Sequence, residues 1–324
     1  MQKESFAGLG VAEPIIEALR RRSIHSPFSI QTLVLPDALA GNDVLAKSPT
    51  GSGKTLAFAV PIVQRLDAAD TKPSALVLVP TRELAVQVAE EFADIGRTRG
   101  LRVAAAYGGT SVGAQAKAAK SAHILVATPG RLEDLARRRL INLDTIRILV
   151  LDEADRMLDM GFQPQVDAIV RRLPRKRQTM FFSATLDGEV AELARSYTQN
   201  PSRIDAGLPA ELERGETEHR FVGVTAEGKV DMLVRMLNHD DGLSLVFVRT
   251  KRGADRLVQR LRRHGVNAAA MHGDMGQGAR ERALAQFESG KVSTLVATDV
   301  AARGLDLDGI SHVINSDPPA DNTG

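Results

Sequence analysis

The sequence predicts an α/β protein with two open parallel sheets, each flanked by helices. The chain has 324 residues, a length that favours two domains at about 150 residues each. Short runs of β-branched residues and leucine alternate with amphipathic stretches, and one turn-rich, charged stretch interrupts the series. Continuous apolar strands joined by helices need cover on both faces, so the strands are expected to run parallel.

The first series of elements occupies roughly the first 200 residues. Its expected strands are 42–47, 75–80, 102–106, 122–127, 146–151 and 178–182. Helical patterns lie between the strands, for example at 54–66, 82–95 and 129–138. This order is typical of crossover connections in a parallel sheet.

The stretch 199–218 mixes proline, glycine and acidic residues without periodicity, which predicts an interdomain linker. We place the amino-terminal domain at 1–206, the linker at 207–218 and the carboxyl-terminal domain at 219–324. The alternation then resumes. The strands expected in the second domain are 219–224, 244–248, 267–271, 293–297 and 311–315, and the helices are 229–237, 252–264 and 277–287.

Composition excludes several classes of function. A net charge of +2 gives no polycationic coat or acidic tail. The chain has no cysteine, which excludes disulfides, thiolate metal sites and a cysteine nucleophile and suits a cytoplasmic location. The first residues have no signal-peptide pattern, and no apolar run is long enough to cross a membrane. Aromatic residues make up only 4%, so base stacking is not the expected main mode of nucleic-acid binding.

A phosphate-binding loop is the strongest local signal. Residues 48–55 read Ser-Pro-Thr-Gly-Ser-Gly-Lys-Thr, after an expected strand and before an expected helix. Thr50, Gly51, Ser52 and Gly53 let backbone N–H groups converge on phosphate oxygens. Lys54 is expected to reach the β- and γ-phosphates, and Thr55 to bind Mg²⁺ through its hydroxyl. The strict pattern has glycine where Ser48 stands, and a simple helix-capping turn is the alternative interpretation.

An acidic pair follows another buried strand. Four apolar residues, 148–151, precede Asp152 and Glu153. In an open α/β sheet ligands bind at the carboxyl ends of strands, where both this pair and the phosphate loop are expected. Asp152 is expected to hold Mg²⁺, and Glu153 to polarise the attacking water. The alternative is a pair of acidic residues that merely favour a helix N-terminus.

The succession of motifs resembles a DEAD-box RNA helicase over nearly the whole chain. Asp-Glu-Ala-Asp at 152–155 stands beside Gly-Ser-Gly-Lys-Thr at 51–55. The other segments that carry the resemblance are 80–85, 108–109, 128–131, 183–185, 245–250, 272–280 and 297–306. The resemblance implies two RecA-like domains joined by a flexible linker, with ATP and Mg²⁺ as cofactors and RNA as partner. It also implies that Ser183 and Thr185 link the nucleotide and RNA sites.

The resemblance further implies an adenine pocket and a contact to the ribose. Gln31 belongs to a partial glutamine motif, and Phe6 matches the family's upstream aromatic residue, which would stack on the base. The family's usual glycine, aromatic and threonine positions hold Ser23, Ile24 and Phe28. An amide can donate to adenine N7 and accept from its N6 amino group. By the same resemblance Asp306 would approach the ribose when the domains close.

Single-stranded RNA is expected to lie across both domains, held through its sugar–phosphate backbone. The expected contacts in the first domain are Thr81, Arg82, Gly109, Thr128, Gly130 and Arg131; those in the second domain are Thr250, Gly273 and Thr298. Backbone contacts predict little sequence preference and strong salt dependence. The preference for RNA over DNA rests on the resemblance.

The chain stops at 321–324, before the family's arginine-rich motif that reaches the γ-phosphate. From this we expect ATP binding with slow hydrolysis. The leading hypothesis is an ATP-dependent RNA helicase that acts by local strand separation. The alternatives are an ATP-gated RNA clamp without catalysis, a DNA translocase and a small-molecule kinase. The Asp152–Asp155 motif and Gln31 argue against the translocase, and the second domain with its segment 297–306 argues against the kinase.

Overall fold

A computed structural model describes residues 5–49, 51–206, 218, 220–225, 227–239, 242–298 and 309–317. The chain divides into two compact units, Met1–Glu216 and Thr217–Gly324. Almost all of the predicted linker, 207–218, lies outside the described residues, so the predicted domain bounds stay a prediction.

The first unit is built on a seven-stranded sheet with the order β3-β4-β2-β5-β6-β1-β7, and all of its pairings are parallel. The strands are β1 (Val44–Lys47), β2 (Ala75–Leu78), β3 (Val103–Ala106), β4 (Ile124–Ala127), β5 (Ile148–Leu151), β6 (Gln178–Ser183) and β7 (Ser202–Asp205). Since all strands point the same way, their carboxyl ends share one edge of the sheet. The predicted fold class is confirmed.

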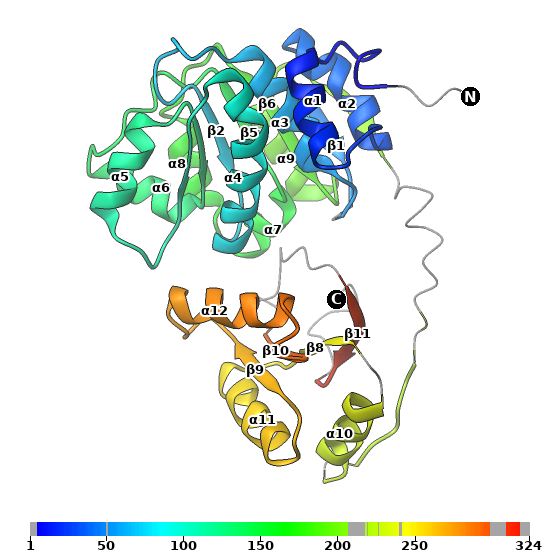
Figure 1. The fold of residues 1–324 in the computed structure, drawn as a ribbon. Coiled ribbons are helices and arrows are strands. Elements are labelled where there is room, and N and C mark those ends of the chain that lie inside the picture. The colour runs from blue at the N-terminus through cyan, green and yellow to red at the C-terminus, as the bar shows by residue number, and fades with distance from the viewer. Residues whose placement is uncertain are drawn as a thin grey trace. The chain divides into compact units, whose positions relative to one another are not determined.

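Helices cover both faces of this sheet (Figure 1). They are α1 (Glu13–Arg21), α2 (Ser29–Ala40), α3 (Lys54–Arg65), α4 (Arg82–Gly96), the 3₁₀ turn η1 (Arg97–Arg99), α5 (Val112–Ser121), α6 (Pro129–Arg137), α7 (Ala154–Asp159), α8 (Gln163–Val170) and α9 (Gly188–Tyr197). Helices α1 to α4 pack on one face, and α5 to α9 pack on the other.

Alternation within the strands explains the two layers of core. In β5, Ile148 and Val150 join the cluster under α1 to α4, whereas Leu149 and Leu151 join the cluster under α5 to α9. Because successive side chains of a strand point to opposite faces, a strand that is apolar at every position can serve both layers. Strands β2, β4, β5 and β6 are therefore buried at every position, whereas β3 and β7 at the two sides of the sheet are partly exposed.

The second unit contains a four-stranded parallel sheet in the described residues, with the order β11-β8-β10-β9. The strands are β8 (Leu243–Phe247), β9 (Ala268–Met271), β10 (Thr294–Ala297) and β11 (Ile310–Asn315). The helices are α10 (Lys229–His239), α11 (Lys251–Arg263) and α12 (Gln277–Glu288). Helices α10 and α11 pack on one face of the sheet and α12 on the other (Figure 1).

Two segments differ from the sequence-based expectation. A strand is expected at 219–224, but residues 220–224 have no regular secondary structure and Phe221 is 98% exposed. No described strand pairs with these residues, so their alternating apolar side chains do not pack on a sheet. The linker pattern beginning at 199 in turn contains β7, which extends the sheet beside β1.

None of the helices in the described part of the chain is long and apolar enough to cross a membrane.

Asp317 joins three elements of the second unit, and its removal is expected to lower stability. The Lys229 ammonium at the start of α10 lies 2.7 Å from Oδ1, and the Arg249 N–H after β8 donates to Oδ2 at 2.9 Å. Partial burial acts to raise the pKa of the Asp317 carboxyl, but these two partners outweigh it and the pKa lies below its ordinary value. Both side chains of the ion pair are about one third exposed, so solvent screening limits their contribution.

We expect Asp317→Ala to lower the free energy of unfolding by about 0.5–1 kcal/mol at neutral pH. A carboxyl with a depressed folded-state pKa stabilises above its unfolded pKa and loses that contribution as the pH falls through the folded value. The difference between variant and parent, measured by denaturant unfolding, should therefore vanish in acid. A difference that grows in acid would contradict this account.

Candidate functional site

The phosphate loop lies between β1 and α3, as its motif requires. Gly51 and Gly53 have φ values of +79° and +78°, a conformation that glycine adopts without steric cost. The Ser48 N–H donates to the Ser183 carbonyl at 2.9 Å, and the hydroxyls of Ser48 and Ser52 are hydrogen-bonded to each other. Serine in place of the motif's first glycine thus adds a side-chain bond inside the loop. Thr50 lies outside the described residues.

Lys54 and the acidic pair meet at the carboxyl edge of the sheet. The Lys54 ammonium lies 3.3 Å from Asp152 Oδ1 and 3.8 Å from Glu153 Oε1. All three side chains are at most 8% exposed. Helix α3 begins at Lys54 and strand β5 ends just before Asp152, so residues about 100 positions apart form one buried charge cluster.

One carboxylate oxygen of Asp152 is buried without a hydrogen-bond partner among the described residues. Its Oδ1 accepts the Glu153 N–H at 2.9 Å and faces Lys54, while its Oδ2 has no hydrogen-bond partner among the described residues. An unpaired buried carboxylate oxygen is costly unless a cation or a donor occupies it. Oxygen is also the ligand atom that Mg²⁺ prefers. The unpaired Oδ2 of Asp152 therefore has the chemistry of a magnesium ligand, although the described residues contain no cluster of three His, Asp or Glu side chains that could hold a metal.

Glu153 is held in an unusual backbone conformation. Its φ of +54° is left-handed, which is uncommon for a residue with a side chain. Burial and the neighbouring Asp152 raise the pKa of the Glu153 carboxyl above its ordinary value, while Lys54 and Arg156 act in the opposite direction. The Arg156 guanidinium lies 3.0 Å from Oε2. A carboxylate with a raised pKa suits a general base.

Asp155 connects the acidic motif to the segment after β6. Its Oδ2 accepts the N–H groups of Ala184 at 3.0 Å and Thr185 at 3.2 Å, and its own N–H donates to Ser183 Oγ at 3.3 Å. The expected neighbourhood of Ser183 and Thr185 with the acidic motif is therefore present in the structure. Asp155 and Arg156 had no assigned role in the sequence, because a one-dimensional pattern does not show which side chains bridge two strand ends.

Gln31 is bonded directly to the phosphate loop. Its Oε1 accepts the Phe28 N–H at 3.0 Å, and its Nε2 donates to the Gly53 carbonyl at 2.8 Å. The Phe28 ring, 45% exposed, lies against Gly53 so closely that a Cβ there would come within 2.3 Å of a ring carbon. Phe28, which departs from the family pattern, is thus a further residue of this site.

One predicted ligand contact, Phe6, does not lie at the site. Phe6 is only 2% exposed and packs in the core with apolar residues such as Val11 and Ile15. A buried ring offers no face to a base, so the placement of Phe6 does not support stacking. Its apolar surroundings account for its position, as for an ordinary core residue. Asp306 lies outside the described residues.

The candidate RNA contacts of the first unit follow β2, β3 and β4. These strands are neighbours in the order β3-β4-β2, whereas the nucleotide residues follow β5, β6 and β1. Both groups lie at the carboxyl edge of one sheet, and the boundary between them is the β2–β5 pair. The topology thus separates the two sets of candidate residues along one continuous edge.

Individual side chains in this group have defined local partners. Thr81 caps α4 by accepting the Leu84 N–H at 3.3 Å, and the Arg82 guanidinium lies beside Gly108. Arg131 donates to the Thr110 carbonyl at 3.1 Å and to the Gln115 side chain. Thr128 precedes α6, whose second residue, Gly130, has open space where a Cβ would be, and Gly109 has a φ of +88°.

The candidate contacts of the second unit follow β8, β9 and β10, which are also adjacent. Thr250 caps α11 by accepting the Gly253 N–H at 3.0 Å. The side chain of Lys251 passes 3.6 Å from the position of a Cβ on Gly273. Thr298 is 7% exposed, and its N–H donates to the Met271 carbonyl at 3.3 Å. These residues therefore share the carboxyl edge of the second sheet.

Family models match both parts of the chain. Residues 28–193 match the model described as DEAD/DEAH box helicase. Residues 228–324 match the model described as helicase conserved C-terminal domain.

Curated relatives match over nearly the whole chain. It is 40% identical over 318 residues to the DEAD-box ATP-dependent RNA helicase CshA of Streptococcus pneumoniae, covering 98% of this chain and 60% of the relative. It is 42% identical over 323 residues to the ATP-dependent RNA helicase DeaD of Escherichia coli, covering 98% of this chain and 51% of the relative. The chain thus spans between half and two thirds of the length of these relatives.

Solved structures show the same fold. Saccharomyces cerevisiae Dbp5 bound to RNA and ADP BeF3 matches with a TM-score of 0.83 and 30% identity, covering 98% of this chain and 82% of that chain. A DEAD box protein from Methanococcus jannaschii matches with a TM-score of 0.61 and 36% identity, covering 97% of this chain and 85% of that chain. The two-sheet architecture is therefore that of RecA-like domains in this group of structures.

Proposed function

Because this chain belongs to the DEAD/DEAH box helicase family, we propose that it is an RNA-stimulated ATPase that separates short RNA duplexes locally. The observation that carries the proposal is the buried cluster in which Lys54 faces both Asp152 and Glu153, at 3.3 and 3.8 Å. A cation and two carboxylates at the carboxyl edge of a parallel sheet, beside a glycine-rich loop, can bind a metal–triphosphate and activate water.

ATP and Mg²⁺ are the proposed cofactors. The unpaired Oδ2 of Asp152 and the hydroxyl of Thr55 would hold the ion, directly or through water. When bound, magnesium would neutralise charge on the β- and γ-phosphates. Lys54 would move from the carboxylates to the phosphate oxygens, joined by the loop N–H groups of Gly51, Ser52 and Gly53.

Glu153 is the proposed group that receives the proton from the attacking water. Its raised pKa makes it a better base than an exposed glutamate, and Arg156 fixes one of its oxygens at 3.0 Å. Asp155 would carry the effect of nucleotide binding to Thr185 through the N–H bond at 3.2 Å. This would give the first unit a short path from the bound phosphate to the end of β6.

RNA is the proposed partner, bound through its backbone. In the first unit, the N–H groups at the start of α6 and the side chains of Arg82 and Arg131 supply donors for phosphate oxygens. In the second unit, Thr250, Gly273 and Thr298 are the corresponding proposed contacts. Closure of the two domains over ATP, with Asp306 near the ribose, would then bend one strand and release the other.

The proposal is tested by ATP turnover with and without single-stranded RNA. We expect RNA to accelerate phosphate release, and ATP to strengthen RNA binding reciprocally. The second candidate function, an ATP-gated RNA clamp, predicts that ATP strengthens RNA binding without being hydrolysed. Single-turnover hydrolysis distinguishes the clamp from the ATPase. RNA that changes neither turnover nor nucleotide affinity would refute both.

Gln31→Ala is expected to reduce discrimination between ATP and GTP about tenfold. The Gln31 amide uses one acceptor position on the Phe28 N–H and one donor position on the Gly53 carbonyl, and adenine would take its second donor and acceptor, whereas guanine presents O6 where adenine presents N6. Gln31 is 1% exposed, so the base would have to displace the residues that cover it. The measurement is the ratio of ATP and GTP affinities in parent and variant.

The matched control for this prediction is Gln64→Ala. The Gln64 amide also bridges two backbone groups, the Ala12 N–H and the Gly10 carbonyl, both at 2.8 Å, but it lies at the other end of α3. An unchanged ratio in Gln31→Ala, or an equal loss in the control, would exclude Gln31 from the adenine pocket.

A further inference from the structure

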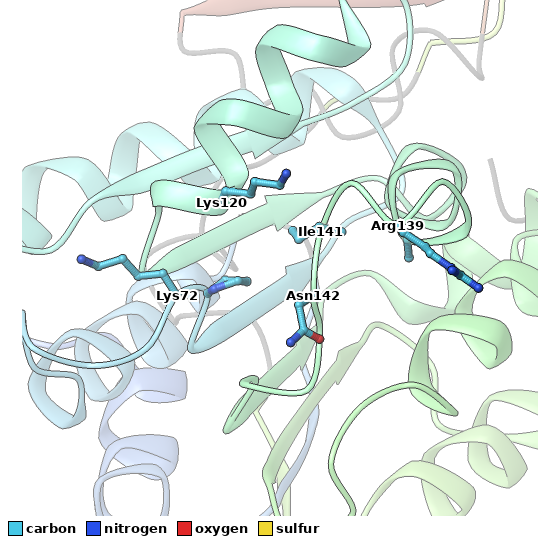
Figure 2. Close-up of a pocket in the computed structure, with 7 residues that line it drawn as sticks. Lys72, Lys120, Arg139, Ile141 and Asn142 are labelled. Carbon is cyan, nitrogen blue, oxygen red and sulfur yellow. The ribbon is translucent and has the colours of Figure 1, made fainter.

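The opposite edge of the first sheet carries a cavity that the proposed function does not use. Its volume is about 500 Å³, and it lies among the segments that precede β2 and β5 and the carboxyl-terminal ends of α5 and α6. Its lining residues are Lys72, Pro73, Lys120, Ala136, Arg139, Ile141 and Asn142. Figure 2 shows Lys72 and Lys120 on one side of Ile141 and Asn142, and Arg139 on the other; the charged ends of Lys72 and Arg139 point away from each other.

The lining carries three cations and no carboxylate. In the described part of the chain none of the three forms an ion pair. Nearby cations behave differently: Arg137 and Arg138 pair with Asp134, and Arg147 pairs with Asp70. Three uncompensated cations around a concavity raise the local concentration of anions and favour anion binding.

Arg139 occupies a position where glycine is preferred. The Arg139 N–H donates to Ala136 O at 3.0 Å and the Leu140 N–H donates to Leu135 O at 2.9 Å, which is the pattern of a Schellman motif that ends α6. Arg139 is the left-handed residue of this motif, with φ of +56°. A side chain in this conformation costs stability that glycine would avoid, so the cation is not explained by the turn.

We propose that this cavity is an accessory binding site for phosphate groups. The Lys120 ammonium would contact phosphate oxygens, the side chains of Lys72 and Arg139 would turn toward the cavity to join it, and the Asn142 amide would add a neutral donor. Pro73, Ala136 and Ile141, which are buried, make up the apolar part of the lining. The phosphates come either from a nucleic-acid strand or from a free polyphosphate compound.

The site is separate from both proposed sites of the first unit. The cavity lies at the amino-terminal ends of the strands, and both proposed sites lie at the carboxyl ends. Strands β2, β4 and β5 are four residues long, so about 13 Å separates the two edges. No lining residue belongs to the phosphate loop, the acidic motif or the candidate RNA contacts. Failure of this proposal therefore leaves the proposed function untouched, and the reverse also holds.

The test is a titration of the full chain, with its nucleotide site saturated by ADP, followed by the amide resonances of Ile141 and Asn142. Inorganic pyrophosphate and a short single-stranded RNA are the two probes. We expect saturable shifts with at least one probe, and about tenfold weaker binding for Arg139→Gly. Since glycine relieves the left-handed residue, this variant should be at least as stable as the parent, and lost binding cannot reflect unfolding.

The two probes show which kind of compound supplies the phosphate groups. Shifts with RNA, and a salt slope smaller by about 0.7 in Arg139→Gly, assign the site to a strand. Shifts with pyrophosphate alone assign it to a free polyphosphate. Lys117→Ala, which removes an exposed cation of α5 outside the cavity, is the matched control and should bind as the parent does.

Three results would overturn the proposal. They are no saturable shift with either probe, an equal loss of binding in Lys117→Ala, and equal shifts with polyglutamate, which would indicate a general attraction of anions or an acidic peptide.

Discussion

Lys54→Ala is expected to abolish detectable nucleotide binding and to destabilise the nucleotide-free protein by about 3–5 kcal/mol at neutral pH. The substitution removes the ammonium that faces Asp152 and Glu153, whose side chains are 1% and 3% exposed. Two adjacent buried carboxylates would then lack a major part of their compensation, because Arg156 contacts only Glu153. The same change removes the proposed contact to the β- and γ-phosphates.

The destabilisation should depend on pH in a defined direction. Without the ammonium the pKa of the Glu153 carboxyl, already raised by burial and by Asp152, would rise further. A group with a raised folded-state pKa favours folding below its unfolded pKa, and that contribution is lost as the pH rises through the folded value. The deficit of Lys54→Ala against the parent should therefore be largest at neutral pH and shrink in acid.

The control for this variant is Lys47→Ala at the end of β1. Lys47 pairs with Asp205 at 3.8 Å, but the two side chains are 43% and 74% exposed, so little stability is lost with them. Denaturant unfolding over a range of pH compares the two variants. Equal stability of the two variants at neutral pH would show that the Lys54 cluster is not the buried unit described here.

Glu153→Gln is expected to lower the rate of ATP hydrolysis by about 10²–10⁴-fold while nucleotide affinity is retained. Glutamine keeps the shape and can still accept a hydrogen bond from Arg156, but it cannot take a proton from water. It also removes the repulsion with Asp152, so folding stability should not fall. The ATP- and RNA-bound form should accumulate, because the step that ends it is blocked.

Single-turnover hydrolysis and the dissociation of labelled RNA in ATP measure these effects. Asp159→Asn, on the exposed part of the same helix α7, removes a carboxylate without touching the cluster and should behave as the parent. If Glu153→Gln hydrolyses ATP at the parental rate, or releases RNA as readily, Glu153 is not the group that activates water.

Local patterns in the sequence predicted most elements of the fold. Strands β1, β2, β4 and β5 are short apolar runs with a helix after each, and that alternation is enough to predict a parallel sheet. The order of the strands was not predictable, because it depends on pairings such as β1 with β6 that join residues far apart in sequence. The strand expected at 219–224 failed for the same reason, since alternation predicts a strand only where a partner strand exists.

The candidate site, too, was predictable from the sequence only in part. Lys54, Asp152 and Gln31 stand in motifs whose spacing indicates their chemistry, and the structure brings their side chains to one edge. Burial was not visible in the sequence, so Phe6 was expected at a base but lies in the core. The bridge from Asp155 to Thr185 and the cavity around Arg139 are formed by groups from separate helices and loops, which no linear pattern brings together.

The ladder between β2 and β5 has a mechanical consequence. The Asp152 N–H donates to the Leu78 carbonyl at 3.0 Å, so the peptide that carries the metal-ligand candidate is bonded to the strand that leads into Thr81 and Arg82. If triphosphate binding displaces that peptide, either this hydrogen bond is strained or β2 moves with the peptide. A movement at the nucleotide residues could therefore reach the candidate RNA contacts across one pair of neighbouring strands, which are about 4.8 Å apart. A long chain of contacting side chains would not be needed.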